Sequence, residues 1–122
     1  MSLASYLEKS ADHHNNIDLL KKTWLQIEKD LGLDDKRLDF SGNTNTAFEE
    51  LVGHTKSELE HIFNTRGEYL YSLMYRADVS EKRMGLIIKD GLDVNAKLAS
   101  LLVERELLKV LTREYYRSQS SH

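Results

Sequence analysis

The sequence contains no proline and no cysteine. An average chain of this length would carry about six prolines, so glycine and capping side chains must end its helices. Without cysteine and without an Asn-x-Ser/Thr glycosylation sequon, nothing in the sequence points to an oxidising or glycosylating compartment. These absences predict a cytoplasmic location.

Long hydrophobic runs are absent as well. A membrane-spanning helix needs roughly 18 consecutive apolar residues, and no run comes near that length. The residues are 40% hydrophobic and 30% charged, which is typical of a folded soluble chain and argues against disorder. We therefore expect no membrane contact and one domain over residues 1–122, ending in a frayed polar tail at 118–122.

Charge is shared unevenly between the two halves of the chain. The net charge is −3, from 17 basic and 20 acidic side chains. Residues 1–60 carry 7 basic and 12 acidic side chains, whereas residues 61–122 carry 10 and 8. An acidic half and a mildly basic half are expected to attract each other, within the fold or between subunits.

Apolar residues recur at helical spacing in residues 15–33. Their steps of three and four residues place them on one narrow stripe. The stripe consists of Ile17, Leu20, Trp24, Ile27 and Leu31. Gly32 can end this helix in a left-handed turn, after which Leu33 folds back. The polar stretch 11–16 predicts a break between this helix and a first helical segment around Tyr6.

Two capping boxes follow a polar loop. Thr46 and Thr55 each precede a glutamate by three residues, so each hydroxyl can accept an amide proton while the glutamate reaches back. This pattern predicts two short helices, at 47–53 and 56–65, hinged at Gly53.

Three more helices are expected in the second half of the chain. They span about 67–77, 81–90 and 94–117, and Asp78 and Ser80 both have the character of caps between the first two. No segment shows the alternation of a β-strand. The sequence therefore predicts an all-α fold, a compact single-domain bundle of five or six helices with a long C-terminal helix.

The last helix carries two apolar faces. One face consists of Val94, Leu98, Leu101, Leu108 and Tyr115, and the opposite face of Ala96, Ala99, Val103, Leu107, Val110 and Leu111. A helix at the edge of a monomer needs only one apolar stripe, so this helix either lies centrally or meets another chain. The second alternative predicts a homodimer. The apolar centre of its interface would be Val103, Leu107, Val110 and Leu111.

The helix at 67–77 holds a cluster of three tyrosines. Its leucines and methionine gather on one face, which we expect in the core. Tyr71 and Tyr75 lie a turn apart on one flank, next to Arg76. Buried rings with hydroxyls reaching polar partners are the favoured interpretation, and a surface for a protein partner is the alternative.

Glu58 and His61 form the sharpest chemical motif. Side chains three residues apart on a helix point the same way, and such a pair can ligate iron or manganese in a helical carboxylate site. Glu50 and His54 extend the same stripe, but the predicted hinge separates them from it. The site needs a second Glu-x-x-His, which the chain does not contain, so only a symmetric dimer could complete it. A solvated helix face is the favoured interpretation, and no cofactor is expected.

Four cations step along the last helix at every fourth residue, and they are Arg105, Lys109, Arg113 and Arg117. With Tyr115 and Tyr116 nearby, this basic ridge has the pattern of a phosphate-tracking surface. The sequence pI of about 5.9 and the interleaved glutamates argue against nucleic-acid binding, and cations near a helix C-terminus also oppose the helix dipole favourably. A solvated or internally paired ridge is the favoured interpretation.

An enzyme ranks below a binding module. The chain has no cysteine nucleophile, no Gly-x-Ser-x-Gly elbow and no phosphate-cradling or dinucleotide-binding loop. The leading hypothesis is a helical protein that acts through protein contacts, above all self-association. The alternatives are a metal-binding protein or enzyme that uses Glu58 and His61 across a dimer, and a nucleic-acid-binding accessory that uses the basic ridge.

Overall fold

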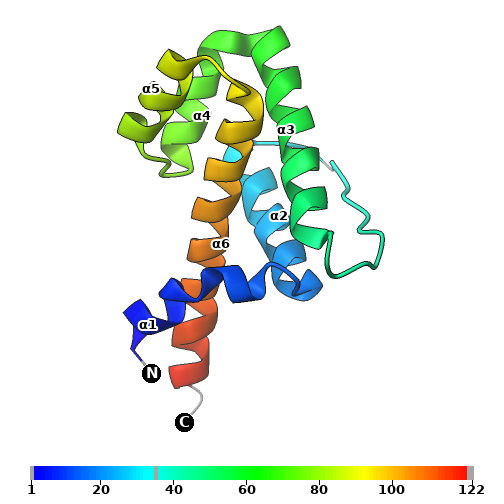
Figure 1. The fold of residues 1–122 in the computed structure, drawn as a ribbon, viewed down its shortest axis with the longest axis vertical. Helices are drawn as coiled ribbons and strands as arrows, with labels where there is room; N and C mark the ends of the chain where they lie inside the picture. Colours follow the sequence, from blue (N-terminus) through cyan, green and yellow to red (C-terminus); the bar gives the residue numbers. More distant parts are fainter. Residues whose placement is uncertain (1, 35, 121–122) are drawn as a thin grey trace.

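The computed structural model describes residues 2–34 and 36–120, and within them all regular structure is helical (Figure 1). Its α-helices are α1 (Leu3–Glu8), α2 (Ile17–Leu31), α3 (Ala47–Arg66), α4 (Leu70–Arg76), α5 (Glu81–Asp90) and α6 (Val94–Ser120). Two 3₁₀ turns, η1 (Ser10–His13) and η2 (Gly67–Tyr69), precede α2 and α4. The prediction of an all-α bundle with a long last helix is confirmed. Of the tail predicted to fray, residues 118–120 belong to α6, and 121–122 lie outside the described residues.

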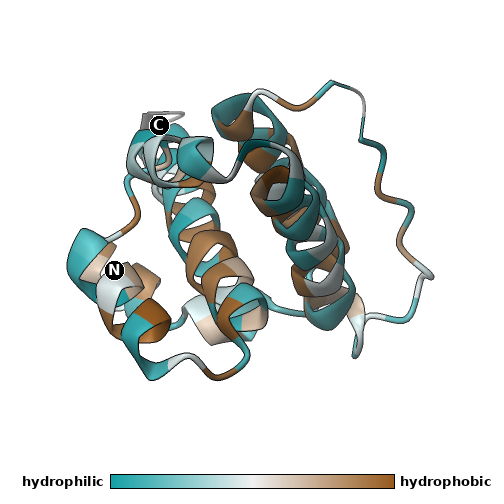
Figure 2. Ribbon diagram, turned by 90° about the horizontal axis from the view of Figure 1, so that it is seen from above, coloured by the Kyte–Doolittle hydropathy of each residue, from teal (hydrophilic) through white to brown (hydrophobic). Residues whose placement is uncertain are grey.

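Helix α6 is the central element of the bundle. It runs along the long axis of the molecule, with α2 and α3 on one side and α4 and α5 beside its N-terminal half (Figure 1). It packs against α1, α2, α3 and α5. Figure 2 shows hydrophobic and hydrophilic residues alternating along the helices, as expected when each helix buries one face. Of the two explanations for the two apolar faces of α6, the structure supports the central position.

The core lies between α6 and the helices packed on it. Its largest fully buried side chains are Leu20, Ile27, Leu31, Leu51, Leu59, Ile62, Met74, Met84, Leu98, Leu102, Leu107 and Leu111. Each such side chain stabilises the fold by roughly 1.5–3 kcal/mol relative to an exposed one. The core therefore joins residues from α2 through α6, and α6 contributes to it from Leu98 to Leu111.

Helix α2 forms where the apolar stripe predicts it. The side chain of Asn16 caps its start by accepting a hydrogen bond from the amide of Leu19 at 3.2 Å. Gly32, with a φ of 66°, ends it in the left-handed region, and the Leu33 amide donates to the Glu28 carbonyl at 2.9 Å. The predicted break before α2 is confirmed, because α1 stops short of it and η1 intervenes.

The prediction of two short helices hinged at Gly53 is wrong, because α3 is one continuous helix. Neither threonine side chain caps a helix. The hydroxyl of Thr46 donates to the Glu50 carboxylate, and that of buried Thr55 donates to the Leu51 carbonyl, each at 2.8 Å. The buried residues of α3 follow one stripe along the whole helix, so packing against α6 outweighs the local capping signals.

The turn between α4 and α5 bears out one predicted cap and not the other. The Ser80 hydroxyl oxygen accepts a hydrogen bond from the Arg83 amide at 3.2 Å and caps α5, which ends at Gly91 with a φ of 75°. Asp78 has a φ of 64°, and its carboxylate accepts a hydrogen bond from the Arg105 guanidinium of α6. The Asp78 side chain thus forms a long-range ion pair with Arg105 and does not cap a helix as predicted.

Candidate functional site

The four residues expected at the centre of an interface all lie inside the chain. Val103, Leu107 and Leu111 are 0% exposed, and Val110 is 3% exposed. Helices of the same chain cover this face of α6. In this structure these side chains are core residues of a single chain, which leaves little of them exposed to another chain.

The segment that carries the tyrosine cluster buries its leucines and methionine and exposes its three tyrosines. The leucines and the methionine of α4 are buried, as predicted. Tyr71 is 53% exposed, Tyr75 is 70% exposed, and Arg76 beside them is also exposed. The expectation that both rings are buried at a packing boundary does not hold, and this flank of α4 is exposed.

An open groove of about 770 Å³ lies between α5 and α6. A second hollow of about 550 Å³ shares four of its lining residues and continues to the turn that joins α4 to α5. We call the two together the α5–α6 groove. Its apolar lining residues are Tyr75, Val79, Ile87, Ala96, Leu101 and Leu108.

Charges of both signs also line the α5–α6 groove. The cations are Arg83, Lys97 and Arg105, and the carboxylates are Asp78, Glu81, Asp93 and Glu104. The hydrogen bond and the charge of Arg105 hold the pKa of Asp78 below its ordinary value. Lys97 is paired with Asp90 of α5 at 2.9 Å. The groove therefore combines apolar side chains with nearly balanced charge.

Glu58 and His61 lie on α3, as predicted. Within residues 2–34 and 36–120, no group of three or more His, Cys, Asp or Glu side chains is placed to hold a metal ion. The continuous helix puts Glu50 and His54 on the same element as this pair, but both are engaged elsewhere. The loop before α3 binds the Glu50 carboxylate, and the His54 ring lies edge-on to Trp24 with 4.5 Å between ring centroids. A metal at Glu58 and His61 would need ligands from another chain.

The basic ridge is internally paired. The partners are Asp78 for Arg105, Asp30 and Glu106 for Lys109, Gln26 for Arg113, and Glu114 for Arg117. Several of these partners belong to α2 or to the turn after α4, so the ridge ties α6 to the rest of the bundle. Most of its positive charge is thus used within the fold.

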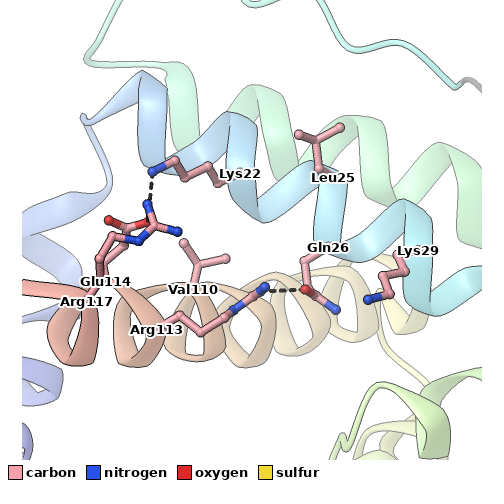
Figure 3. Close-up of a pocket in the computed structure, with 8 residues that line it drawn as sticks. All are labelled: Lys22, Leu25, Gln26, Lys29, Val110, Arg113, Glu114 and Arg117. Atoms are coloured by element: carbon pink, nitrogen blue, oxygen red, sulfur yellow. Dashed lines mark hydrogen bonds and ion pairs between the residues drawn. The ribbon is translucent and has the colours of Figure 1, made fainter. Parts of the chain in front are cut away.

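A smaller groove, of about 340 Å³, lies between α2 and the C-terminal half of α6 (Figure 3). Its lining residues are Lys22, Leu25, Gln26, Lys29, Val110, Arg113, Glu114 and Arg117. We call it the α2–α6 groove. Two of its cations belong to the basic ridge, whereas Lys22 and Lys29 come from α2. Sequence reasoning missed these two lysines, because periodicity within one helix does not reveal which helix lies beside it.

Glu106 is the other group that sequence reasoning missed, since it reads as one of the glutamates interleaved with the ridge. Its side chain is completely buried. Oε1 accepts a hydrogen bond from Lys109 at 2.7 Å, whereas Oε2 has no hydrogen-bond partner among the described residues. Burial raises the pKa of Glu106 to about 7. The same ammonium group donates to Asp30 at 3.0 Å, so one cation serves two carboxyl groups between α2 and α6.

None of the helices in the described part of the chain is both long and apolar enough to cross a membrane. Comparisons with protein-family models, with curated proteins and with solved structures found no match to this chain. The function has to be inferred from the two grooves and from the side chains that line them.

Proposed function

We propose that this protein acts through protein contacts, as a self-associating helical module, and that two copies meet through the α5–α6 groove. The observation that carries the proposal is the apolar surface along this groove. Leu108 of α6 and Ile87 of α5, both half-buried, line it together with buried Leu101, and Tyr75 at its far end is 70% exposed. Apolar and aromatic side chains of this kind contribute most of the energy when a partner covers them.

The charges of the groove support a second copy as the partner. Among the described residues, three cations and four carboxylates line it, so the surface is close to neutral. In a two-fold dimer the same patch faces itself, and a patch with both signs of charge can place cations against carboxylates of the other copy. A patch of one sign would repel itself.

The proposed contact uses the face of α6 opposite to the one that the sequence pattern predicts for a dimer interface. The face that holds Leu107 and Leu111 is buried in the core, whereas Leu108 is only half-buried and lines the open groove. Tyr71 and Arg76, both exposed on α4, would lie at the edge of the contact. We place this module in the cytoplasm, which the absence of cysteine and of glycosylation sequons supports.

Spin labels on single cysteines test this geometry, because the chain has no cysteine of its own. Lys97→Cys places a label in the α5–α6 groove, and Ser57→Cys places one at an exposed position of α3. Helix α3 lies on the other side of α6 from α5 (Figure 1). Each label then reports only distances between copies. Groove residues lie close to the two-fold axis, so we expect shorter distances for the Lys97 label than for the Ser57 label.

Two outcomes would contradict the proposal. One is the absence of dipolar coupling at both positions at protein concentrations where other soluble dimers are assembled. The other is a Ser57 label with distances as short as those of the Lys97 label, which would place the contact on α3. Circular dichroism of both labelled variants controls for an intact helical fold.

A further inference from the structure

We propose that the α2–α6 groove is a binding site for an acidic segment of another protein. The inference goes beyond self-association and does not depend on it, because the two grooves share no lining residue among those described. The class of ligand follows from the cations of the groove, from the carboxylate already bound there and from its apolar positions.

Cations from two helices face each other across the groove. Lys22 and Lys29 come from α2, Arg113 and Arg117 come from α6, and Glu114 is the single carboxylate among the described lining residues. Figure 3 shows the side chains of Lys22 and Lys29 extending from α2 toward α6. A ligand between the helices would therefore meet positive charge on both sides.

Two of the cations already hold a carboxylate of the chain. Oε1 of Glu114 accepts a hydrogen bond from Lys22 at 2.8 Å and lies 3.6 Å from the guanidinium of Arg117. The hydrogen bond from Lys22, together with the charges of Arg117 and Arg113, lowers the pKa of Glu114. The local potential at this position thus favours a bound carboxylate.

The other two cations make no ion pair with any described residue. The structure gives Lys29 no such partner, and Arg113 donates to the side-chain carbonyl of Gln26, which is a neutral group. An amide oxygen accepts the hydrogen bond of a guanidinium but does not neutralise its charge. A carboxylate from a ligand can therefore bind Lys29 and Arg113 without displacing an ion pair of the fold.

Two apolar residues line the groove beside the cations, and in Figure 3 the Leu25 side chain extends from the edge of α2 that is turned away from α6. Val110 of α6 is 3% exposed, whereas Leu25, which lies between the two lysines along α2, is 64% exposed. A leucine this exposed at the edge of a groove can contact an apolar side chain of a ligand. The groove thus fits a segment that carries both carboxylates and an apolar side chain, as an acidic amphipathic helix does.

A protein segment fits this site better than a nucleic acid does. The chain has a net charge of −3, which repels a long polyanion, whereas a short acidic segment needs only a local cluster of cations. The ridge also does not continue beyond the groove as a track for phosphates. Arg105 and Lys109, its next two cations, are held by carboxylates of the fold.

Fluorescence anisotropy provides the test. The probe is a labelled peptide that repeats Glu and Leu at helical spacing, and the comparison probe is a labelled single-stranded oligonucleotide of equal charge. We expect saturable binding of the peptide at low ionic strength and weaker binding as salt is added, because exposed ion pairs are screened. Failure of this binding would leave self-association through the α5–α6 groove untouched.

A double charge reversal and its matched control make the test specific. Lys29→Glu with Arg113→Glu should weaken peptide binding about tenfold, because two attractions become repulsions. Lys21→Glu with Lys82→Glu changes the net charge equally at exposed lysines outside the groove, and should change the affinity by less than about twofold. Should the first variant fail to fold by circular dichroism, Lys29→Ala with Arg113→Ala replaces it.

Three results would overturn the proposal. The first is no saturable binding of the peptide by the unmodified protein at low salt. The second is equal weakening by the two charge-reversal variants, which would reduce the effect to net charge. The third is tighter binding of the oligonucleotide than of the peptide, which would assign the groove to nucleic acid.

Discussion

The ammonium group of Lys109 lies 2.7 Å from Oε1 of Glu106, a carboxyl group that is completely buried. Burial raises the pKa of Glu106 from its ordinary value of 4.5 to about 7 in the folded protein. Below about pH 4.5 both the folded and the unfolded chain hold this proton. Between about 4.5 and 7 only the folded chain keeps it, so Glu106 makes stability fall as the pH rises, and above about 7 that loss is complete.

Replacing Glu106 with glutamine tests this linkage. Glutamine keeps the shape of the protonated side chain but cannot ionise. The difference in the free energy of unfolding between the variant and the unmodified protein should therefore grow in favour of the variant by about 2 kcal/mol from pH 5 to pH 8. Urea unfolding of both proteins at the two pH values measures the change. Carboxylates whose pKa is lowered, such as Asp30 and Glu114, stabilise the fold at neutral pH and lose that contribution only in acid. Because their lowered pKa values lie below this pH range, they stay ionised throughout the comparison. A stability difference that is the same at both pH values would contradict the account.

Trp24 and Leu25 are neighbours on α2 with opposite environments. Trp24 is 4% exposed, and its indole N–H donates to the Lys36 carbonyl at 2.9 Å, whereas Leu25 is 64% exposed. Trp24→Ala should lower the free energy of unfolding by about 3–5 kcal/mol, because it leaves a large cavity and removes the hydrogen bond to the Lys36 carbonyl. Leu25→Ala should change it by less than about 0.5 kcal/mol. Chemical denaturation measures both changes. A loss below about 1 kcal/mol for Trp24→Ala would mean that the face of α2 that carries Trp24 does not pack in the core.

Gly53 lies in the interior of α3, whereas Gly91 lies at the end of α5. A methyl group added at Gly53 would meet no described atom within 4 Å, and the residue lies inside α3. Gly53→Ala should therefore stabilise the protein by about 0.5–1 kcal/mol. Gly91 has a φ of 75°, so Gly91→Ala should destabilise it by about 1 kcal/mol. Thermal unfolding tests both. Destabilisation by Gly53→Ala would instead indicate that α3 needs the hinge that the capping boxes suggest.

The parts of the fold that the sequence predicts correctly depend on residues within a turn or two of each other. The stripe of α2, its end at Gly32 and the cap at Ser80 are all of this kind. The hinge at Gly53 failed because packing along all of α3 outweighs two local capping signals. Local patterns thus locate helices well but do not decide whether neighbouring helices merge.

The grooves depend on which helices lie side by side, and a single sequence does not reveal this. Periodicity shows that α6 has two apolar faces, but not that its own chain covers Val103 and Leu107 and leaves Leu108 beside a groove. In the α2–α6 groove, Lys22 and Glu114 are 92 residues apart in the sequence. Glu106 lies on α6 between the buried residues Val103 and Val110, so its position on an apolar face was a signal in the sequence. That Lys109 and Asp30 meet it there follows only from the approach of α2 to α6.

The most direct test of the central claim is the mass of the protein in solution. Light scattering on a sizing column at tens of micromolar should give twice the 14.1 kDa of one chain for the unmodified protein. Ser100→Arg, which places a large cation in the α5–α6 groove, should give the mass of one chain, and Ser57→Arg on α3 should remain dimeric. A mass of 14.1 kDa for the unmodified protein at every concentration would contradict the claim, and so would a Ser100→Arg variant as dimeric as its control.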